Sequence, residues 1–395
     1  MSSSTPLFPK EIAVQRPSTL DIEERARLFC TDPPHRRDPF ARRNWGGSLH
    51  SLCSYQGKLK PAIGHFLVDW FTEPGDCVVD LMAGVGTIPL EARRLGRSAI
   101  ANDLSPLAYA VATAKLLPMS ESALEQELAH LVKAITDGPS LGQLESTTDV
   151  EWGLNGPIRS YFHPDTLREI LIAREHFRND GFRTVEGNLL AASVMHILHG
   201  NRPYALSRRS HPVTPFKPQG DFEYRSLLDR LSARLSRVVP ELISLAETMP
   251  PGKSFHSDFR HLELSDVDAV ITSPPFAKSL RFWSSNWMRL WFAGWEPPDF
   301  QIEPARYVET EQRKSYEVYS EFAEKAASML KPDGLLVLHL GETRTENMVD
   351  HIRPLLEPGF RVLYSGREEV GDTESHGLSD KGSTTAHWYL FAQKV

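Results

Sequence analysis

The chain has 395 residues, of which 44 are basic and 51 acidic, so its formal net charge is −7. Hydrophobic residues make up 41% and charged residues 24% of the sequence, which is typical of a globular protein and excludes a disordered or fibrous chain. At roughly 100–200 residues per domain, this length predicts two or three structural units.

Cysteine usage and hydropathy narrow the class of protein. Cys30, Cys53 and Cys77 are well separated and form no Cys-x-x-Cys pair, so we expect neither a disulfide framework nor a metal site. The N-terminus lacks a basic region followed by an apolar core, and no apolar run reaches the ~18 residues of a membrane span. These patterns predict a cytoplasmic protein without membrane contact.

Secondary-structure patterns divide the chain into two α/β blocks with a helical segment between them. A strand at 77–81, a glycine-rich turn, a helix at 88–95 and a strand at 98–103 form one strand-helix-strand unit, which implies a parallel sheet. Helical periodicity runs from 117 to 250. Further strands are predicted at 268–272, 335–340 (after a turn at 331–334), 360–365 and 387–393, with a polar, mobile loop at 366–385.

We therefore predict three regions. Residues 1–50 form an N-terminal arm, which is basic because residues 25–60 contain eight basic and two acidic side chains. Residues 51–116 and 251–395 form one α/β domain, and residues 117–250 form a helical insert within it.

The first candidate site follows the strand at 77–81. The turn Asp80-Leu-Met-Ala-Gly-Val-Gly-Thr87 precedes a helix, and glycines 84 and 86 allow a ligand to approach the backbone closely. Asp103 ends the next strand, where a carboxylate can accept hydrogen bonds from two ribose hydroxyls. Together they indicate a cofactor that contains a nucleoside. A dinucleotide site would favour a third glycine near position 89, which is proline.

The second candidate site is Thr272-Ser-Pro-Pro-Phe276, which directly follows another strand. Its two prolines fix φ and remove two backbone donors, which leaves a rigid turn rich in acceptors. The Ser273 hydroxyl, the Pro274 carbonyl and the Phe276 ring would hold a flat ring that carries an amino group. A proline-rich loop with a buried phenylalanine is the alternative.

The two segments together resemble the motif pair of S-adenosylmethionine-dependent amino-methyltransferases that act on DNA, above all the N4-cytosine group with its Ser-Pro-Pro-Phe or Ser-Pro-Pro-Tyr motif. The segment from Tyr55 to Ile63, which includes Lys58, resembles the part of these enzymes that covers the methionine end of the cofactor. The resemblance extends over about residues 50–395. Leu81, Met82 and Val85 depart from the family, which usually has proline, an aromatic residue and serine there.

This resemblance implies a Rossmann-like class I methyltransferase sheet with S-adenosylmethionine as cofactor and double-stranded DNA as partner. A cognate restriction or defence nuclease is a candidate further partner. The implied catalytic residues are Ser273, Pro274, Pro275 and Phe276, and the implied cofactor residues are Tyr55, Lys58, Asp80, Ala83, Gly84, Gly86, Thr87, Asp103 and Asp258. The expected reaction is methylation of a flipped-out base, at cytosine N4, by direct transfer.

Three features of the sequence concern contact with DNA and packing. Arg202, Arg208, Arg209 and Lys217 form a basic segment without acidic residues, and we expect it to contact phosphates within a target-recognition insert. Trp283, Trp287, Trp291 and Trp295 recur every fourth residue, which predicts one buried helix face. Lone histidines such as His196 and His339 are expected to be structural.

Other functions compete with this hypothesis. An adenine-N6 DNA methyltransferase is the nearest rival, because a serine at 273 favours cytosine without excluding adenine. An RNA or small-molecule amino-methyltransferase would use the same socket, and a non-catalytic binding module is a third class.

Overall fold

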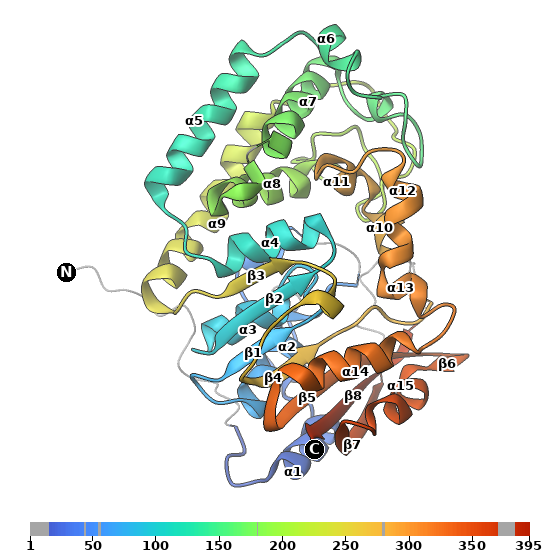
Figure 1. The fold of residues 1–395 in the computed structure, drawn as a ribbon. Helices are drawn as coiled ribbons and strands as arrows, with labels where there is room; N and C mark the ends of the chain where they lie inside the picture. Colours follow the sequence, from blue (N-terminus) through green and yellow to red (C-terminus); the bar gives the residue numbers. More distant parts are fainter. Residues whose placement is uncertain (1–15, 43–44, 54–56, 180, 279–280, 370–383) are drawn as a thin grey trace, which may run out of the picture.

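The computed structural model describes residues 16–395, apart from 43–44, 54–56, 180, 279–280 and 370–383 (Figure 1). The predicted cofactor residue Tyr55 and most of the predicted loop at 366–385 therefore lie outside the described residues. Within the described part of the chain, the three cysteines are free, and no helix has the length and apolar character needed to cross a membrane.

A single sheet organises the lower half of the molecule, with strand order β3-β2-β1-β4-β5-β8-β7 and the short β6 paired to β5. The strands are β1 (Cys77–Asp80), β2 (Ser98–Asp103), β3 (Lys253–His256), β4 (Val267–Thr272), β5 (Leu330–Thr343), β6 (Glu346–Asn347), β7 (Phe360–Glu369) and β8 (Thr384–Lys394). Strands β1 to β5 are parallel, whereas β8 runs antiparallel between β5 and β7. This topology confirms the predicted Rossmann-like fold of the class I methyltransferase type.

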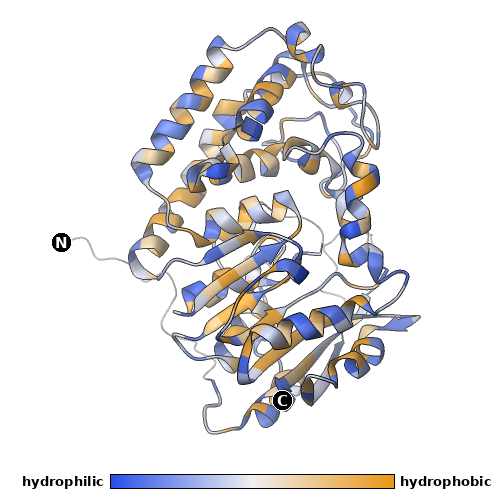
Figure 2. Cartoon of the chain, viewed as in Figure 1, coloured by the Kyte–Doolittle hydropathy of each residue, from blue (hydrophilic) through white to orange (hydrophobic). Residues whose placement is uncertain are grey.

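Helices cover both faces of the sheet, because successive side chains of a strand point to opposite faces. Val78 of β1 packs with α1 (Ile22–Thr31), α2 (Pro61–Phe71), α3 (Thr87–Arg94) and α4 (Pro106–Leu116). Val79 packs on the other face with α14 (Val318–Met329) and α15 (Met348–Leu356). Figure 2 shows hydrophobic residues along the central strands of the sheet.

A helical body lies above the sheet (Figure 1). Its helices are α5 (Glu121–Asp137), α6 (Leu141–Glu145), α7 (Pro164–Asn179), α8 (Val185–Ile197) and α9 (Leu227–Thr248), joined by α10 (Phe282–Ser285), α11 (Trp287–Phe292), α12 (Asp299–Ile302) and α13 (Val308–Glu311). One apolar cluster runs through α7, α8, α9 and α11 and includes Leu107 and Val111 of α4. Helix α4 thus joins the helical body to the sheet.

Several elements differ from the prediction. The tryptophan repeat does not form one helix, because the helical conformation is interrupted at Asn286, between α10 and α11. Trp287, Trp291 and Trp295 are nevertheless buried, as expected for core residues. The predicted turn at 331–334 lies inside β5 as a bulge, since Val267 pairs with Leu330 and Ala269 with Leu335.

Two further differences concern strand ends. Strand β7 continues to Glu369, so the start of the predicted loop at 366–385 is in the sheet. Strand β3 was not predicted, because its four residues are exposed or only half-buried and carry no apolar alternation. The N-terminal region 16–42 is packed on the sheet through Ala26 and Phe29 of α1, which are fully buried.

Candidate active site

The carboxyl ends of β1, β2 and β4 meet at one edge of the sheet, where β1 lies between β2 and β4. In an open α/β sheet, the crevice at such a reversal of strand order is the usual ligand site. A narrow cleft opens there, and its walls come from three loops. They are Gly57, Lys58 and Leu59 before α2; Asp80, Met82, Ala83, Gly84, Val85, Thr87 and Ile88 around the glycine turn; and Ser273 after β4.

The glycine turn forms one wall of this cleft. Gly84 and Gly86 both have left-handed φ angles, of +51° and +69°. A Cβ atom on Gly86 would lie 3.3 Å from the Cβ of Ala112 in α4, so the helix packs tightly beneath the turn. The Ala83 amide donates to the Asn102 carbonyl at 2.9 Å, and α3 begins at Thr87. Gly84 lines the cleft, and close approach of a ligand at this residue stays a prediction.

Asp80 connects the two motifs. Its side chain is 3% exposed, and its Oδ1 accepts hydrogen bonds from Thr272 Oγ1 at 2.6 Å and from the Met82 amide at 3.2 Å. Burial raises the pKa of Asp80 to about 7, although both hydrogen bonds act in the opposite direction. Asp80 is therefore a buried acid that fixes the turn after β4 against the turn after β1.

Asp103 lies at the end of β2 and also supports the glycine turn. Its Oδ2 accepts from the Gly84 amide and its Oδ1 from the Ser105 amide, both at 2.8 Å. Burial raises the pKa of Asp103, and these two backbone bonds oppose the shift. Because a carboxylate offers about four acceptor sites, Asp103 retains capacity for ribose hydroxyls.

The proline turn places its residues as follows. Ser273 and Asp80 line the same cleft. The Pro275 carbonyl accepts from Gln312 Nε2 at 2.9 Å, whereas no donor among the described residues bonds to the Pro274 carbonyl. Phe276 is half-buried and packs over β5, where a Cβ atom on Gly341 would lie 2.6 Å from its ring. The rigid turn with a free Pro274 acceptor matches the sequence-based expectation.

His339, which the sequence predicts to be a structural histidine, contacts the proline turn. It lies on β5, is 3% exposed, and its Nδ1 is 2.9 Å from Ser273 Oγ. Burial holds the pKa of His339 well below its usual range, so the ring is neutral. A neutral Nδ1 that accepts from Ser273 leaves both lone pairs of the serine oxygen free. The only sequence signal is a histidine in an apolar strand.

Lysines lie behind the glycine turn. Lys115 of α4 is fully buried and donates from Nζ to the Val85 carbonyl at 2.5 Å. Burial, together with neighbouring cations, holds the pKa of Lys115 well below its usual range. Lys58, predicted to bind the cofactor, lines the cleft and donates to the His50 carbonyl at 2.6 Å. Sequence reasoning missed Lys115, which sits in an otherwise apolar helix.

Asp258 lies after β3, so it is at the same edge of the sheet as Asp103. Its Oδ1 accepts from the Arg260 amide at 3.0 Å, and its Oδ2 is 3.2 Å from the Arg260 guanidinium. Arg260 is also paired with Glu311 at 2.6 Å. In this structure Asp258 therefore caps a short helical turn, and its contact with an adenine ring stays a prediction.

The basic segment in the helical body is less uniform than its sequence suggests. Arg202, Arg209 and Lys217 are exposed. Arg208 instead donates to the Gly220 carbonyl at 2.7 Å and the Ser160 carbonyl at 2.9 Å, and its guanidinium lies over the Phe222 ring. Arg208 thus holds the surrounding loops together, and contact between DNA and the other three residues remains a prediction.

Comparison with known proteins gives structural matches only. No protein-family model matches the chain, and no curated protein does. Among solved structures, TrmN from Thermus thermophilus is 12% identical, with a TM-score of 0.37 over 88% of this chain, which spans about half (52%) of that protein. TYW2 from M. jannaschii, solved in complex with AdoMet, is 10% identical over 90% of this chain and 80% of its own, with a TM-score of 0.33.

A putative RNA methyltransferase, PH1948 from Pyrococcus horikoshii, is 11% identical over 88% of this chain and 94% of its own, with a TM-score of 0.36. Similarity this low says nothing about the substrate of this chain. The functional assignment therefore depends on the residues of the cleft.

The buried Asp80 predicts a specific pH dependence of stability. Its folded pKa of about 7 lies above the ~4 of an unfolded aspartate, so the folded state binds more protons between these values. The contribution of Asp80 to the free energy of unfolding should therefore fall as pH rises from about 4 to about 7. Asp80→Asn should remove that fall while keeping the acceptor for Thr272.

Denaturant unfolding at pH 5, 6, 7 and 8 measures this difference. The exposed Asp350→Asn variant is the matched control and should follow the wild-type pH curve. Identical pH curves for wild type and Asp80→Asn would contradict a raised pKa at this position.

Proposed function

We propose that the chain is an S-adenosylmethionine-dependent methyltransferase that methylates the exocyclic amine of a DNA base, with cytosine N4 as the expected target. The observation that carries the proposal is the 2.6 Å hydrogen bond between Thr272 and Asp80. It joins two motifs that are 192 residues apart in the chain, and the Ser273 acceptor thereby faces the same cleft as the glycine turn.

The cleft fits such a cofactor. The glycine turn would lie against its methionine end, and Asp103 would accept from its ribose. Thr87 supports this placement, because its hydroxyl is buried in the cleft wall and has no hydrogen-bond partner among the described residues. The buried carboxylates of Asp80 and Asp103 favour a cationic group nearby. When bound, the cofactor supplies a sulfonium methyl group and retains the S–C bonding pair as a neutral thioether.

The proline turn can activate an amine. The lone pair of a cytosine amine is delocalised into its ring, so transfer requires the nitrogen to become pyramidal. Ser273 Oγ and the Pro274 carbonyl would accept its two hydrogens and direct the lone pair toward the methyl group. As the N–C bond forms, positive charge develops on the nitrogen, and these acceptors stabilise it.

The product nitrogen must lose one proton. Ser273 Oγ accepts from that N–H, and His339 Nδ1 lies 2.9 Å behind it. Because burial keeps this imidazole neutral, Nδ1 can accept the serine hydrogen and leave both lone pairs of the serine oxygen for the amine. His339 therefore positions Ser273 as an acceptor, and the proton leaves the product nitrogen for solvent water.

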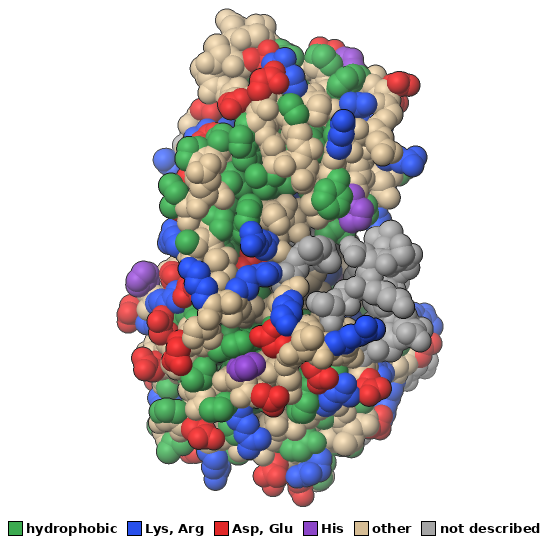
Figure 3. Space-filling view, turned by 90° about the vertical axis from the view of Figure 1, so that its right-hand side faces the viewer, with side chains coloured by type: hydrophobic (Ala, Val, Ile, Leu, Met, Phe, Trp, Pro, Cys, Tyr) green, Lys and Arg blue, Asp and Glu red, His purple; other side chains and the backbone are tan. Residues whose placement is uncertain are grey.

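The charge of the junction between sheet and helical body supports a polyanionic substrate. Arg234 and Arg289 are buried there and donate to the Ser51 and Met195 carbonyl oxygens. On the surface, lysine and arginine side chains gather around the middle of the face in Figure 3, between the helical body and the sheet. Such a field attracts nucleic acid.

The ribose assignment predicts an effect on cofactor affinity. Asp103→Ala removes a charged acceptor, so S-adenosylmethionine binding should weaken by about 1.5–3 kcal/mol, measured by calorimetry. Asp350→Ala, at an exposed site in α15, should bind the cofactor as the wild type does. Wild-type affinity in the Asp103 variant, with its fold confirmed by thermal melting, would remove the ribose assignment.

The amine-acceptor assignment predicts an effect on rate. Ser273→Ala deletes one acceptor but leaves the Pro274 carbonyl, so the single-turnover rate of methyl transfer to DNA should fall while cofactor affinity is kept. Ser284→Ala is the control, because Ser284 is half-buried on α10 and, among the described residues, its hydroxyl donates to the Arg281 carbonyl. An unchanged rate in the Ser273 variant would show that this turn does not hold the amine.

A further inference from the structure

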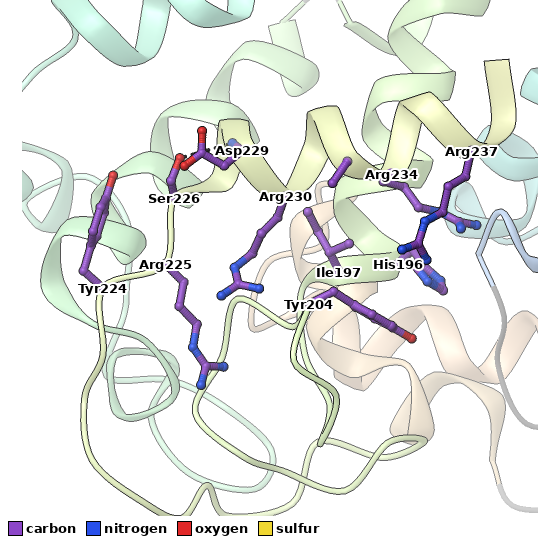
Figure 4. Close-up of a pocket in the computed structure, with 11 residues that line it drawn as sticks. His196, Ile197, Tyr204, Tyr224, Arg225, Ser226, Asp229, Arg230, Arg234 and Arg237 are labelled. Carbon is purple, nitrogen blue, oxygen red and sulfur yellow. Dashed lines mark hydrogen bonds between the residues drawn. The ribbon is translucent and has the colours of Figure 1, made fainter. Parts of the chain in front are cut away.

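A second cavity lies within the helical body, between the end of α8, the start of α9 and the loops that precede α9 (Figure 4). Its volume is about 460 Å³, which is in the range of cavities that hold small ligands. Four arginines line it, namely Arg225, Arg230, Arg234 and Arg237, against one carboxylate, that of Asp229. We call it the α9 pocket.

The helical repeat places three of these arginines on one face of α9. Arg230, Arg234 and Arg237 are four and three residues apart on α9, so they lie on one face of that helix. Arg225 comes from the loop just before α9 and donates to the Ala205 carbonyl at 2.9 Å, which fixes the opposite wall. Figure 4 shows Arg225 and Arg230 on one side of Tyr204 and Arg234 and Arg237 on the other.

Two of these guanidinium groups have unused donors. Arg234 is only 8% exposed, and its Nη2 donates to the Ser51 carbonyl, but its Nε has no partner among the described residues. The Nε of Arg230 is likewise buried and unpaired in the described structure, although its Nη1 donates to the Pro203 carbonyl. A buried donor without an acceptor costs free energy, so an anionic ligand with several oxygens would be stabilised here.

Burial also affects the His196 side of the pocket. The His196 ring stacks on Tyr204, with ring centroids 5.2 Å apart and an interplanar angle of 21°. The His196 Nδ1 is buried and has no hydrogen-bond partner among the described residues. Burial holds the pKa of His196 well below its usual range, so this wall is neutral and the arginines supply the charge. The pocket thus combines a flat wall with a cationic side.

We propose that the α9 pocket binds the phosphate group of a nucleotide, either within a DNA strand or as a free nucleotide, through the guanidinium groups of Arg230, Arg234 and Arg237. The planar guanidinium forms paired hydrogen bonds to phosphate oxygens. The inference that this phosphate belongs to a DNA strand rests on the proposed function.

The position of the pocket favours the strand as the source. Arg234 binds the carbonyl of Ser51, and the chain reaches the cleft residues Gly57 and Lys58 a few residues later. A phosphate held by Arg234 would therefore lie beside the segment that borders the cofactor cleft. The α9 pocket would then anchor DNA backbone outside the flipped base.

The test compares two pairs of charge-neutralising substitutions in the full chain. Arg230→Gln with Arg237→Gln removes two charges from the α9 pocket, and Lys133→Gln with Arg353→Gln removes two exposed charges elsewhere. Binding of a labelled 20-base-pair DNA duplex is measured by fluorescence anisotropy from 50 to 200 mM salt, with cytidine monophosphate as competitor. The pocket pair should weaken binding about tenfold and flatten the salt slope by about two units.

Arg237→Gln alone, at an exposed position, keeps the test valid if the double variant does not fold, and should lower the slope by about one unit. If cytidine monophosphate competes with the duplex and this competition depends on the same arginines, the phosphate bound in the pocket is that of a free nucleotide. If cytidine monophosphate does not compete, the bound phosphate belongs to the DNA strand. The proposal would be overturned if the pocket variants bind the DNA duplex and cytidine monophosphate as tightly as the control pair does.

The outcome is independent of catalysis. Wild-type methyl transfer with no loss of binding in the pocket pair would overturn the α9 pocket and leave the proposed function intact. Arginine-dependent duplex binding by a chain that transfers no methyl group would overturn the proposed function and confirm the phosphate site.

Discussion

The buried hydrogen bond between Thr272 and Asp80 is the contact on which the site depends. Parallel strands β1 and β4 are neighbours, so their carboxyl ends meet, and this contact ties the end of β4 to the end of β1. Because Asp80 is almost fully buried, the bond lies where water cannot replace it. Ser273 is thereby placed in the same cleft as the glycine turn, and the proposed methyl transfer requires that closeness.

The helical body gives this edge of the sheet its positive surroundings. Helix α4 contributes Leu107 and Val111 to the core of the helical body and places Lys115 behind the glycine turn. Helix α9 contributes Arg234, which reaches the Ser51 carbonyl next to the cleft. The same helices that bury apolar surface thus bring basic side chains to the junction.

Strand ends and turns were predictable from the sequence, whereas contacts between distant segments were not. The strand-helix-strand unit around Asp80 and Asp103 follows from local signals, and Ser273 follows from a strand that ends in a proline turn. His339 is 66 residues from Ser273, and only the β4–β5 pairing reveals their contact. The buried leucines of α9 indicate a core helix, and this pattern gives no sign of the arginines on its other face. Arg208 is a basic residue, but it bonds to the Gly220 carbonyl and so has a structural role. The helix is interrupted at Asn286, so the tryptophans that recur every fourth residue do not share one helix.

The most direct measurement of the central claim is the chemical identity of the product. The purified chain is incubated with methyl-labelled S-adenosylmethionine and mixed-sequence duplex DNA, and the digested nucleosides are analysed by mass spectrometry. The account predicts label on an exocyclic amine, as N4-methylcytosine. Label on a ring carbon of the base, or DNA that remains unlabelled while the cofactor is bound, would contradict it.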